Sequence, residues 1–282
     1  MGSAEAVIPC RGWQRASAAL SAAVVLSAGC GGATPSAPTP PPPVVTNTPP
    51  VIASVVTSEP RVDAGDTVQV TATITDPETP VDQLAYAWSA TPVNGAFAGT
   101  GRQVAWTAPT GAPTPGLATI GLSVSESYLS QGLPQKNVVS SSVQIHYNDS
   151  PAELLGLARQ FYTDFWTFSV SPAQCVRNFS DSDACAATKA EELSDITGNR
   201  ENFHILGGTY PAPQVTLNGT KTFATVDGPC AFEDTVNATG AHEVVSGTCH
   251  LSAVYENWQW YLCQSTFDHP LDRTQSFRYR AP

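Results

Sequence analysis

The sequence predicts an all-β sandwich followed by an α+β domain in which N-terminal helices pack on a curved antiparallel sheet. Three observations support this fold class. Residues 48–148 alternate apolar and polar side chains in short runs separated by Gly, Pro and Asp. An apolar stripe with helical spacing begins near residue 150, and strand-like runs follow from about residue 213. Helices followed by a run of strands are typical of an α+β domain.

Composition limits the functions that the chain can have. The chain has 282 residues and a formal net charge of −11, which argues against nucleic acid as a partner because such binding needs basic side chains. No CxxC pair and no His-x-x-x-His spacing occurs, so we expect no metal site. No phosphate-binding loop is present either, and we expect no cofactor.

The N-terminus has the pattern of an export signal. Arg11 and Arg15 precede a short apolar run that ends in Leu26-Ser27-Ala28-Gly29-Cys30. This ending resembles a bacterial lipobox, although Ser27 stands where the strongest lipoboxes carry Leu. The resemblance implies that residues 1–29 are a lipoprotein signal peptide and that Cys30 is lipidated, which gives a stable membrane anchor. An ordinary secretory signal cleaved nearby is the alternative.

Residues 30–47 form a proline-rich linker. Its prolines favour an extended spacer, and a polyproline ligand for a partner is the alternative. Gly31 is not Asp, the residue that retains some lipoproteins in an inner membrane. We therefore expect a lipid-anchored protein of the cell envelope, in the outer membrane, facing the periplasm or the surface.

Residues 48–148 contain about seven short strands, which fits an immunoglobulin-like sandwich. The segments Ala64–Val68, Asp76-Pro77-Glu78 and Leu84–Trp88 resemble a polycystic-kidney-disease-type (PKD) module. That resemblance implies a spacer or a weak binder. Asp76 and Glu78 are interpreted as a solvated turn rather than a calcium site, and Trp88 as a core residue.

Residues 149–270 are predicted to begin with helices. Ser150 is the expected N-cap, with Pro151 and Glu153 completing the start of the first helix. The apolar stripe of that helix consists of Leu154, Leu157, Phe161, Phe165 and Phe168. A second helix is predicted over Ala186–Ile196, capped by Ser182 or Asp183, and a short third turn over Asn199–Phe203.

A meander of strands follows, and residues 271–282 are expected to be a disordered tail. A two-residue turn at Glu256-Asn257 would place Tyr255 opposite Trp258. Cysteines in this half indicate an oxidising compartment. We predict two disulfides, Cys230–Cys249 across the sheet and Cys175–Cys185 closing a local loop, and leave Cys263 as an odd thiol that could re-pair with a neighbour.

The element order and the hairpin Ala253–Trp260 resemble the cone-like nuclear-transport-factor (NTF2) and SnoaL-like folds. The resemblance implies helices around a pocket; some members are enzymes that use a pocket Asp with Tyr, and many have no catalytic residue. The polar candidates here are Tyr162, Asp164, Asp195 and His204. Asp164 and Asp195 are interpreted as solvated helix positions, and His204 as structural. No catalytic residue is assigned.

Aromatic residues are the remaining candidates for ligand contacts: Tyr162, Trp166, Trp258 and Trp260. They anchor helix against sheet, or they line a pocket or sugar platform. The leading hypothesis is a lipid-anchored, non-enzymatic envelope protein that displays a binding domain on a β-sandwich spacer. Its partners would be the membrane and an unknown protein, small-molecule or glycan ligand. The alternatives are a SnoaL-like pocket enzyme and a carbohydrate-binding adhesin.

Overall fold

The computed structural model of the chain describes residues 46–268. The expected signal peptide, Cys30, the linker before residue 46 and the tail lie outside these residues. Within the described part, none of the helices combines the length and the apolar character needed to cross a membrane.

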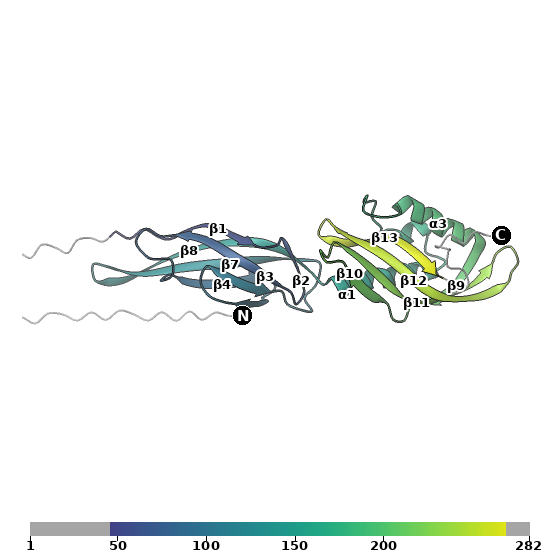
Figure 1. The fold of residues 1–282 in the computed structure, drawn as a ribbon, viewed down its shortest axis with the longest axis horizontal. Helices are drawn as coiled ribbons and strands as arrows, with labels where there is room; N and C mark the ends of the chain where they lie inside the picture. Colours follow the sequence, from purple (N-terminus) through teal and green to yellow (C-terminus); the bar gives the residue numbers. More distant parts are fainter. Residues whose placement is uncertain (1–45, 269–282) are drawn as a thin grey trace, which may run out of the picture. The chain divides into compact units, whose positions relative to one another are not determined.

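Residues 46–148, the two-sheet part, contain two four-stranded sheets (Figure 1). The strands of the first sheet lie in the order β1 (Val51–Thr57), β3 (Thr67–Thr75), β6 (Gln103–Thr107) and β5 (Ala96–Ala98). Those of the second sheet lie in the order β2 (Arg61–Asp63), β8 (Leu133–Asn148), β7 (Gly116–Ser130) and β4 (Ala85–Thr91). Only β2 with β8 is a parallel pair in these two sheets.

The alternation of β3 shows why this region folds as strands. Every second residue of β3 is buried, and the others are exposed, as one face packs on a core and the other meets water. The core contains Val70 and Trp106 from the first sheet and Ile120 from the second. Trp88 is only partly buried at its edge, where its indole N–H donates to Gly101 O. Trp106 is the fully buried tryptophan.

Residues 149–268, the helix–sheet part, have the predicted α+β order. Its helices are α1 (Ser150–Trp166), α2 (Pro172–Cys175) and α3 (Lys189–Asn202). The antiparallel sheet has the order β10 (Gln214–Leu217), β11 (Phe223–Val236), β12 (His242–Glu256) and β13 (Gln259–Asp268), with β9 (Phe203–Thr209) also paired to β11. The helices come first in the chain and pack on the strands that follow.

The helix starts differ from the predicted ones. Asp149, not Ser150, caps α1, and its carboxylate accepts from Ala152 N. Ser150 is buried and donates from its hydroxyl to Asp63 at 2.6 Å. Thr188 caps α3 in a capping box with Glu191, and α3 continues through the predicted third turn. Both helices are present as predicted, but the first is capped one residue earlier and the second five to six residues later than expected.

The end of α1 is held by one side chain from α3. The Arg200 guanidinium donates to the carbonyl oxygens of Asp164 and Phe165, each at 3.2 Å, and to that of Thr167 at 3.4 Å. These carbonyls lie in the last turn, where a helix has no internal donor for them. A cation there also complements the helix dipole. Phe168, predicted to continue the apolar stripe, lies beyond the helix and is exposed.

The turn between β12 and β13 corrects the predicted register. Asn257 and Trp258 occupy the turn, with φ values of 49° and 67°. Two successive left-handed residues are the geometry of a type I′ hairpin turn. Tyr255 is therefore opposite Trp260 rather than Trp258. Trp258 therefore lies in the turn, and Trp260 is buried as the partner of Tyr255.

The disulfides correct one of the two predicted pairs. Cys230 is bonded to Cys249, as predicted, but Cys185 is bonded to Cys263 and Cys175 is a buried free thiol. The reason is that the chain after α2 runs along β13. Ser180 N donates to Leu262 O at 2.7 Å, and Leu262 N donates to Asn178 O at 2.9 Å. This pairing brings residues distant in sequence together, which spacing alone does not reveal.

Peptide mapping under non-reducing conditions tests this pairing. We expect Cys185–Cys263 and Cys230–Cys249 cross-linked peptides, and an unmodified Cys175 that reacts with a thiol reagent only after unfolding. The Cys185–Cys263 bond spans 78 residues and the other bond 19. On loop entropy, removing the longer cross-link costs about 4.5 kcal/mol of stability and the shorter about 3 kcal/mol. A Cys175–Cys185 peptide would contradict the structure.

Candidate functional site

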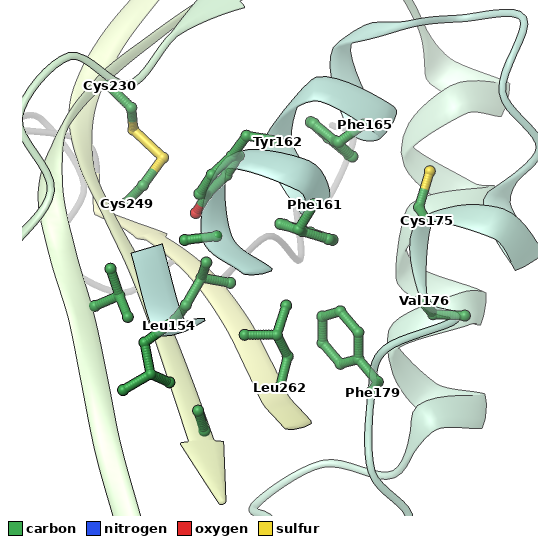
Figure 2. Packing of buried hydrophobic residues seen from close by; sticks show 14 of the residues in the cluster. Leu154, Phe161, Tyr162, Phe165, Cys175, Val176, Phe179, Cys230, Cys249 and Leu262 are labelled. Atoms are coloured by element: carbon green, nitrogen blue, oxygen red, sulfur yellow. A yellow bond between two sulfur atoms is a disulfide. The ribbon is translucent and has the colours of Figure 1, made fainter. Parts of the chain in front are cut away.

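The candidate site is the interior between α1 and the sheet of the helix–sheet part. Figure 2 shows Tyr162 on the side of α1 that faces the strands carrying Cys230 and Cys249. The side chains of Leu154, Phe161 and Phe165 project from the same helix and are also buried. Spacings of three, four and seven residues place side chains on one face of a helix, so the sequence pattern itself builds this wall.

Aromatic rings gather around Tyr162. Its ring stacks on Trp166 with centroids 5.4 Å apart and packs against Tyr210 at 4.6 Å. Trp166 approaches the backbone of β9 so closely that a Cβ on Gly208 would lie 2.3 Å from the indole nitrogen. A glycine is required there by space and not by its φ angle. The structure thus brings together two of the predicted contact residues, Tyr162 and Trp166.

Polar atoms next to this aromatic group have no hydrogen-bond partner among the described residues. They are the hydroxyl of Tyr162 and the indole nitrogen of Trp166. Burial raises the pKa of Tyr162 well above its ordinary value, so the hydroxyl keeps its proton and remains a donor. Leaving a buried donor without an acceptor costs about 1–3 kcal/mol. Such groups are available to bind a ligand atom or a water molecule.

Glu192 adds a carboxylate to the same interior. It lies on α3, is only 3% exposed, and accepts from the hydroxyl of Ser265 at 2.9 Å and from Ser265 N at 3.3 Å. Burial raises the pKa of Glu192 to about 7, and the bonds from Ser265 oppose that increase. A carboxyl group with this pKa exchanges a proton near neutral pH.

Glu192 was missed as a site residue, although a sequence signal existed. It precedes Ile196 by four residues, so the two share one helix face, and Ile196 is buried. Asp181, earlier in the same segment, accepts from Lys189 N at 3.0 Å. Among the described residues, no group of three acidic, His or Cys side chains could hold a metal ion.

The other polar candidates have structural partners. Asp164 is buried, pairs with Arg177 and accepts from Gln160 Nε2 at 2.9 Å. The interpretation of Asp164 as a solvated helix position is therefore wrong. Asp164 is buried because the chain after α1 folds back and places Arg177 against its carboxylate. His204 is exposed and packs on Phe168 at 4.2 Å, outside the interior.

The two remaining tryptophans do not share a surface. Trp258 is 45% exposed in the β12–β13 turn and stacks on His146 at 3.9 Å with nearly parallel rings. Trp260 is 4% exposed, contacts the Tyr255 ring at 5.4 Å, and has no hydrogen-bond partner for its indole nitrogen in the described part of the chain. They therefore cannot form one flat platform.

Comparison with known proteins shows similarity in fold. No family model and no curated protein matches the chain. A ketosteroid isomerase-like protein from Erwinia carotovora is 14% identical, with 44% of this chain and 98% of that one covered and a TM-score of 0.38. A nuclear transport factor 2-like superfamily protein from Salmonella enterica is 11% identical, covering 45% and 94%, with a TM-score of 0.37. A Nostoc punctiforme protein of unknown function with a cystatin-like fold is 15% identical, covering 43% and 94%, with a TM-score of 0.31.

Glu192 makes the stability of the fold depend on pH. The pKa of Glu192 in the folded chain, about 7, exceeds the ordinary value of 4.5. The folded chain therefore keeps this proton up to a higher pH than the unfolded chain does. Stability therefore falls as pH rises from about 4.5 to 7, by about 3 kcal/mol for this carboxyl group alone. Urea unfolding across this range should show the loss in the native chain and much less of it in Glu192→Gln.

Glu201→Gln is the matched control, because it removes an exposed carboxylate from the same helix. This variant should retain the native pH dependence. If the free energy of unfolding depended on pH equally in the native chain and in Glu192→Gln, the buried position of Glu192 would be contradicted.

Proposed function

We propose that the chain is a lipid-anchored cell-envelope protein without enzymatic activity, which displays a binding domain on a β-sandwich spacer. The lipid is attached at Cys30, and the outer membrane is the proposed location. The binding domain is the helix–sheet part, and its partner is a protein, a small molecule or a glycan.

The observation that carries this proposal is the way the helix–sheet part uses its polar side chains. Asp164 is neutralised by Arg177, Glu192 is hydrogen-bonded to Ser265, and Tyr210 donates to Val226 O. Leu154, Leu251 and Leu262 are fully buried among the aromatic rings. This arrangement supports a packed domain that recognises a partner more than one that positions a nucleophile and a base.

Two further observations support the location and the spacer. Both disulfides lie in the helix–sheet part, which suits a compartment outside the reducing cytoplasm. The two-sheet part has its own hydrophobic core, consistent with an independently folded immunoglobulin-like or PKD-type spacer. Such a module would hold the binding domain away from the membrane.

Changing Cys30 to Ser tests the anchor. Without the thiol no thioether to diacylglycerol can form, so the chain should move from the membrane fraction to the soluble fraction. Mass spectrometry should show the diacylglycerol on the native chain only. Cys10→Ser is the control and should leave membrane association unchanged, since Cys10 precedes the proposed cleavage site. Lipid on the Cys30→Ser chain would overturn the proposal.

A pocket enzyme is the second candidate, and one observation favours it. The unpaired Tyr162 hydroxyl and the Glu192 carboxyl, whose pKa is about 7, belong to the same interior, and the charge of Glu192 contributes to the raised pKa of Tyr162. A hydrogen-bond donor and a carboxyl group that exchanges a proton near neutral pH are components of general acid–base chemistry. Turnover of a small hydroxy or keto compound that disappears in Glu192→Gln would favour this candidate over the binding domain.

Phenylalanine substitutions at Tyr162 and Tyr210 distinguish an unused hydroxyl from a structural one. Tyr162→Phe removes a buried donor without a partner and should stabilise the ligand-free chain by about 1 kcal/mol. Tyr210→Phe removes a donor to Val226 O and should destabilise it by a similar amount. Urea unfolding of both variants measures the difference. Destabilisation by Tyr162→Phe would show that the hydroxyl has a partner.

A further inference from the structure

The hairpin of β7 and β8 extends beyond the body of the two-sheet part. The last partner of β7 in β4 is reached at Ser125, which pairs with Ala85. From Glu126 onward β7 pairs with β8 alone, up to a two-residue turn at Gln131 and Gly132 with φ of 53° and 75°. Figure 1 shows this hairpin tip extending past β4 at the end where β1 begins.

The hairpin tip, residues 127–137, differs in chemistry from the rest of the chain. The chain has a net charge of −11, yet these residues contain no acid and a single base, Lys136. Leu129 and Leu133 are each 63% exposed, and Val138 next to the tip is 56% exposed. Large apolar side chains exposed together indicate a binding surface.

The apolar side chains occupy both faces of the hairpin. Leu129 is opposite Pro134, and Ser130 is opposite Leu133. Because side chains alternate along a strand, Leu129 and Pro134 share one face while Leu133 lies on the other with Tyr128. A protein partner that docks on a sheet would cover one face. A lipid surface surrounds a tip that enters it end-on, and so suits both faces.

The described chain begins at the foot of this hairpin. Glu126 is buried there, and its carboxylate accepts from the Asn47 side chain and from Asn137 Nδ2 at 3.3 Å. Asn47 is therefore fixed next to the tip, and Cys30 precedes it by seventeen residues. Even as extended polyproline, that length reaches only about 50 Å. A lipid on Cys30 keeps the tip within reach of the membrane.

We propose that the β7–β8 hairpin tip contacts the membrane to which Cys30 is anchored, with Leu129 and Leu133 entering the lipid headgroup region. This inference rests on the proposed lipid anchor. Tethering makes the second contact intramolecular, so a tip too small to bind vesicles alone still binds when anchored. The contact would fix which end of the two-sheet part faces the membrane.

The tip chemistry limits the depth of insertion. The outer edges of a two-stranded hairpin have backbone groups without strand partners, and hydrocarbon would leave those groups unsatisfied. Tyr128 and Lys136 combine apolar atoms with a polar end, which suits the interface between headgroups and acyl chains. The leucines therefore enter the interface, and the foot at Glu126 remains in water.

An environment-sensitive fluorophore at the tip tests the proposal. The full lipidated chain, with Leu133→Cys labelled by nitrobenzoxadiazole, is reconstituted in phosphatidylethanolamine–phosphatidylglycerol vesicles. We expect higher fluorescence and a shift of emission to shorter wavelength than in detergent-free buffer without vesicles. Leu117→Cys is the control, because it is also an exposed apolar position of β7 but lies about 40 Å along the strand from the tip. The intensity and emission wavelength of the label at 117 should be the same with and without vesicles.

Flotation of the same vesicles separates the anchor from the tip. A chain that floats, with a shifted label at 133 and none at 117, supports the inference, and an added Leu129→Ser should reduce the shift. A chain that floats without any shift at 133 overturns the tip contact and leaves the anchor intact. A shift that depends on protein concentration and not on lipid overturns it in favour of a second copy. A chain that does not float removes the anchor and this inference together.

Discussion

The burial of α1 against the five-stranded sheet is the interaction on which the helix–sheet part depends. Leu154, Phe161 and Phe165 supply the apolar face, and each of them is at most 2% exposed. Both ends of the helix are held by tertiary partners, since Ser150 bonds to Asp63 and Arg200 donates to the carbonyls of the last turn. An isolated helix of this length would be marginal in water, so packing and these end contacts stabilise it.

This packing also determines the electrostatics of the interior. Removing water from the space between α1 and the sheet disfavours charged side chains, and the pKa values of Tyr162 and Glu192 rise for that reason. Arg177 supplies a positive charge to the buried Asp164, whereas the hydrogen-bond donors to Glu192 within residues 46–268 are the neutral groups of Ser265. The carboxylates of Asp164 on α1 and Glu192 on α3 therefore have different partners, a charged side chain for Asp164 and neutral groups of the sheet for Glu192.

The two-sheet part combines a conventional core with an unusual end. Its interior consists mainly of aliphatic and aromatic side chains in alternating strand positions, and its long β7–β8 hairpin continues beyond that core. The same end fixes Asn47, from which the chain continues toward Cys30. Asn47, the start of the segment that leads to the proposed anchor, thus lies close to an exposed apolar surface, although the two are far apart in sequence. A module that acted only as a passive spacer would not need such a surface.

The sequence by itself determined the order of elements, the amphipathic face of α1, the alternating strands and the Cys230–Cys249 bond, because these follow from local periodicity or from neighbouring strands. Tertiary structure alone decided the Cys185–Cys263 bond and the pairing of Asp164 with Arg177. Each of these depends on the segment after α1 folding back along β13, a long-range contact with no periodic signature. The different exposures of Trp258 and Trp260 have a local cause: the two left-handed residues Asn257 and Trp258 form the turn, so Trp258 lies in it and Trp260 becomes the partner of Tyr255.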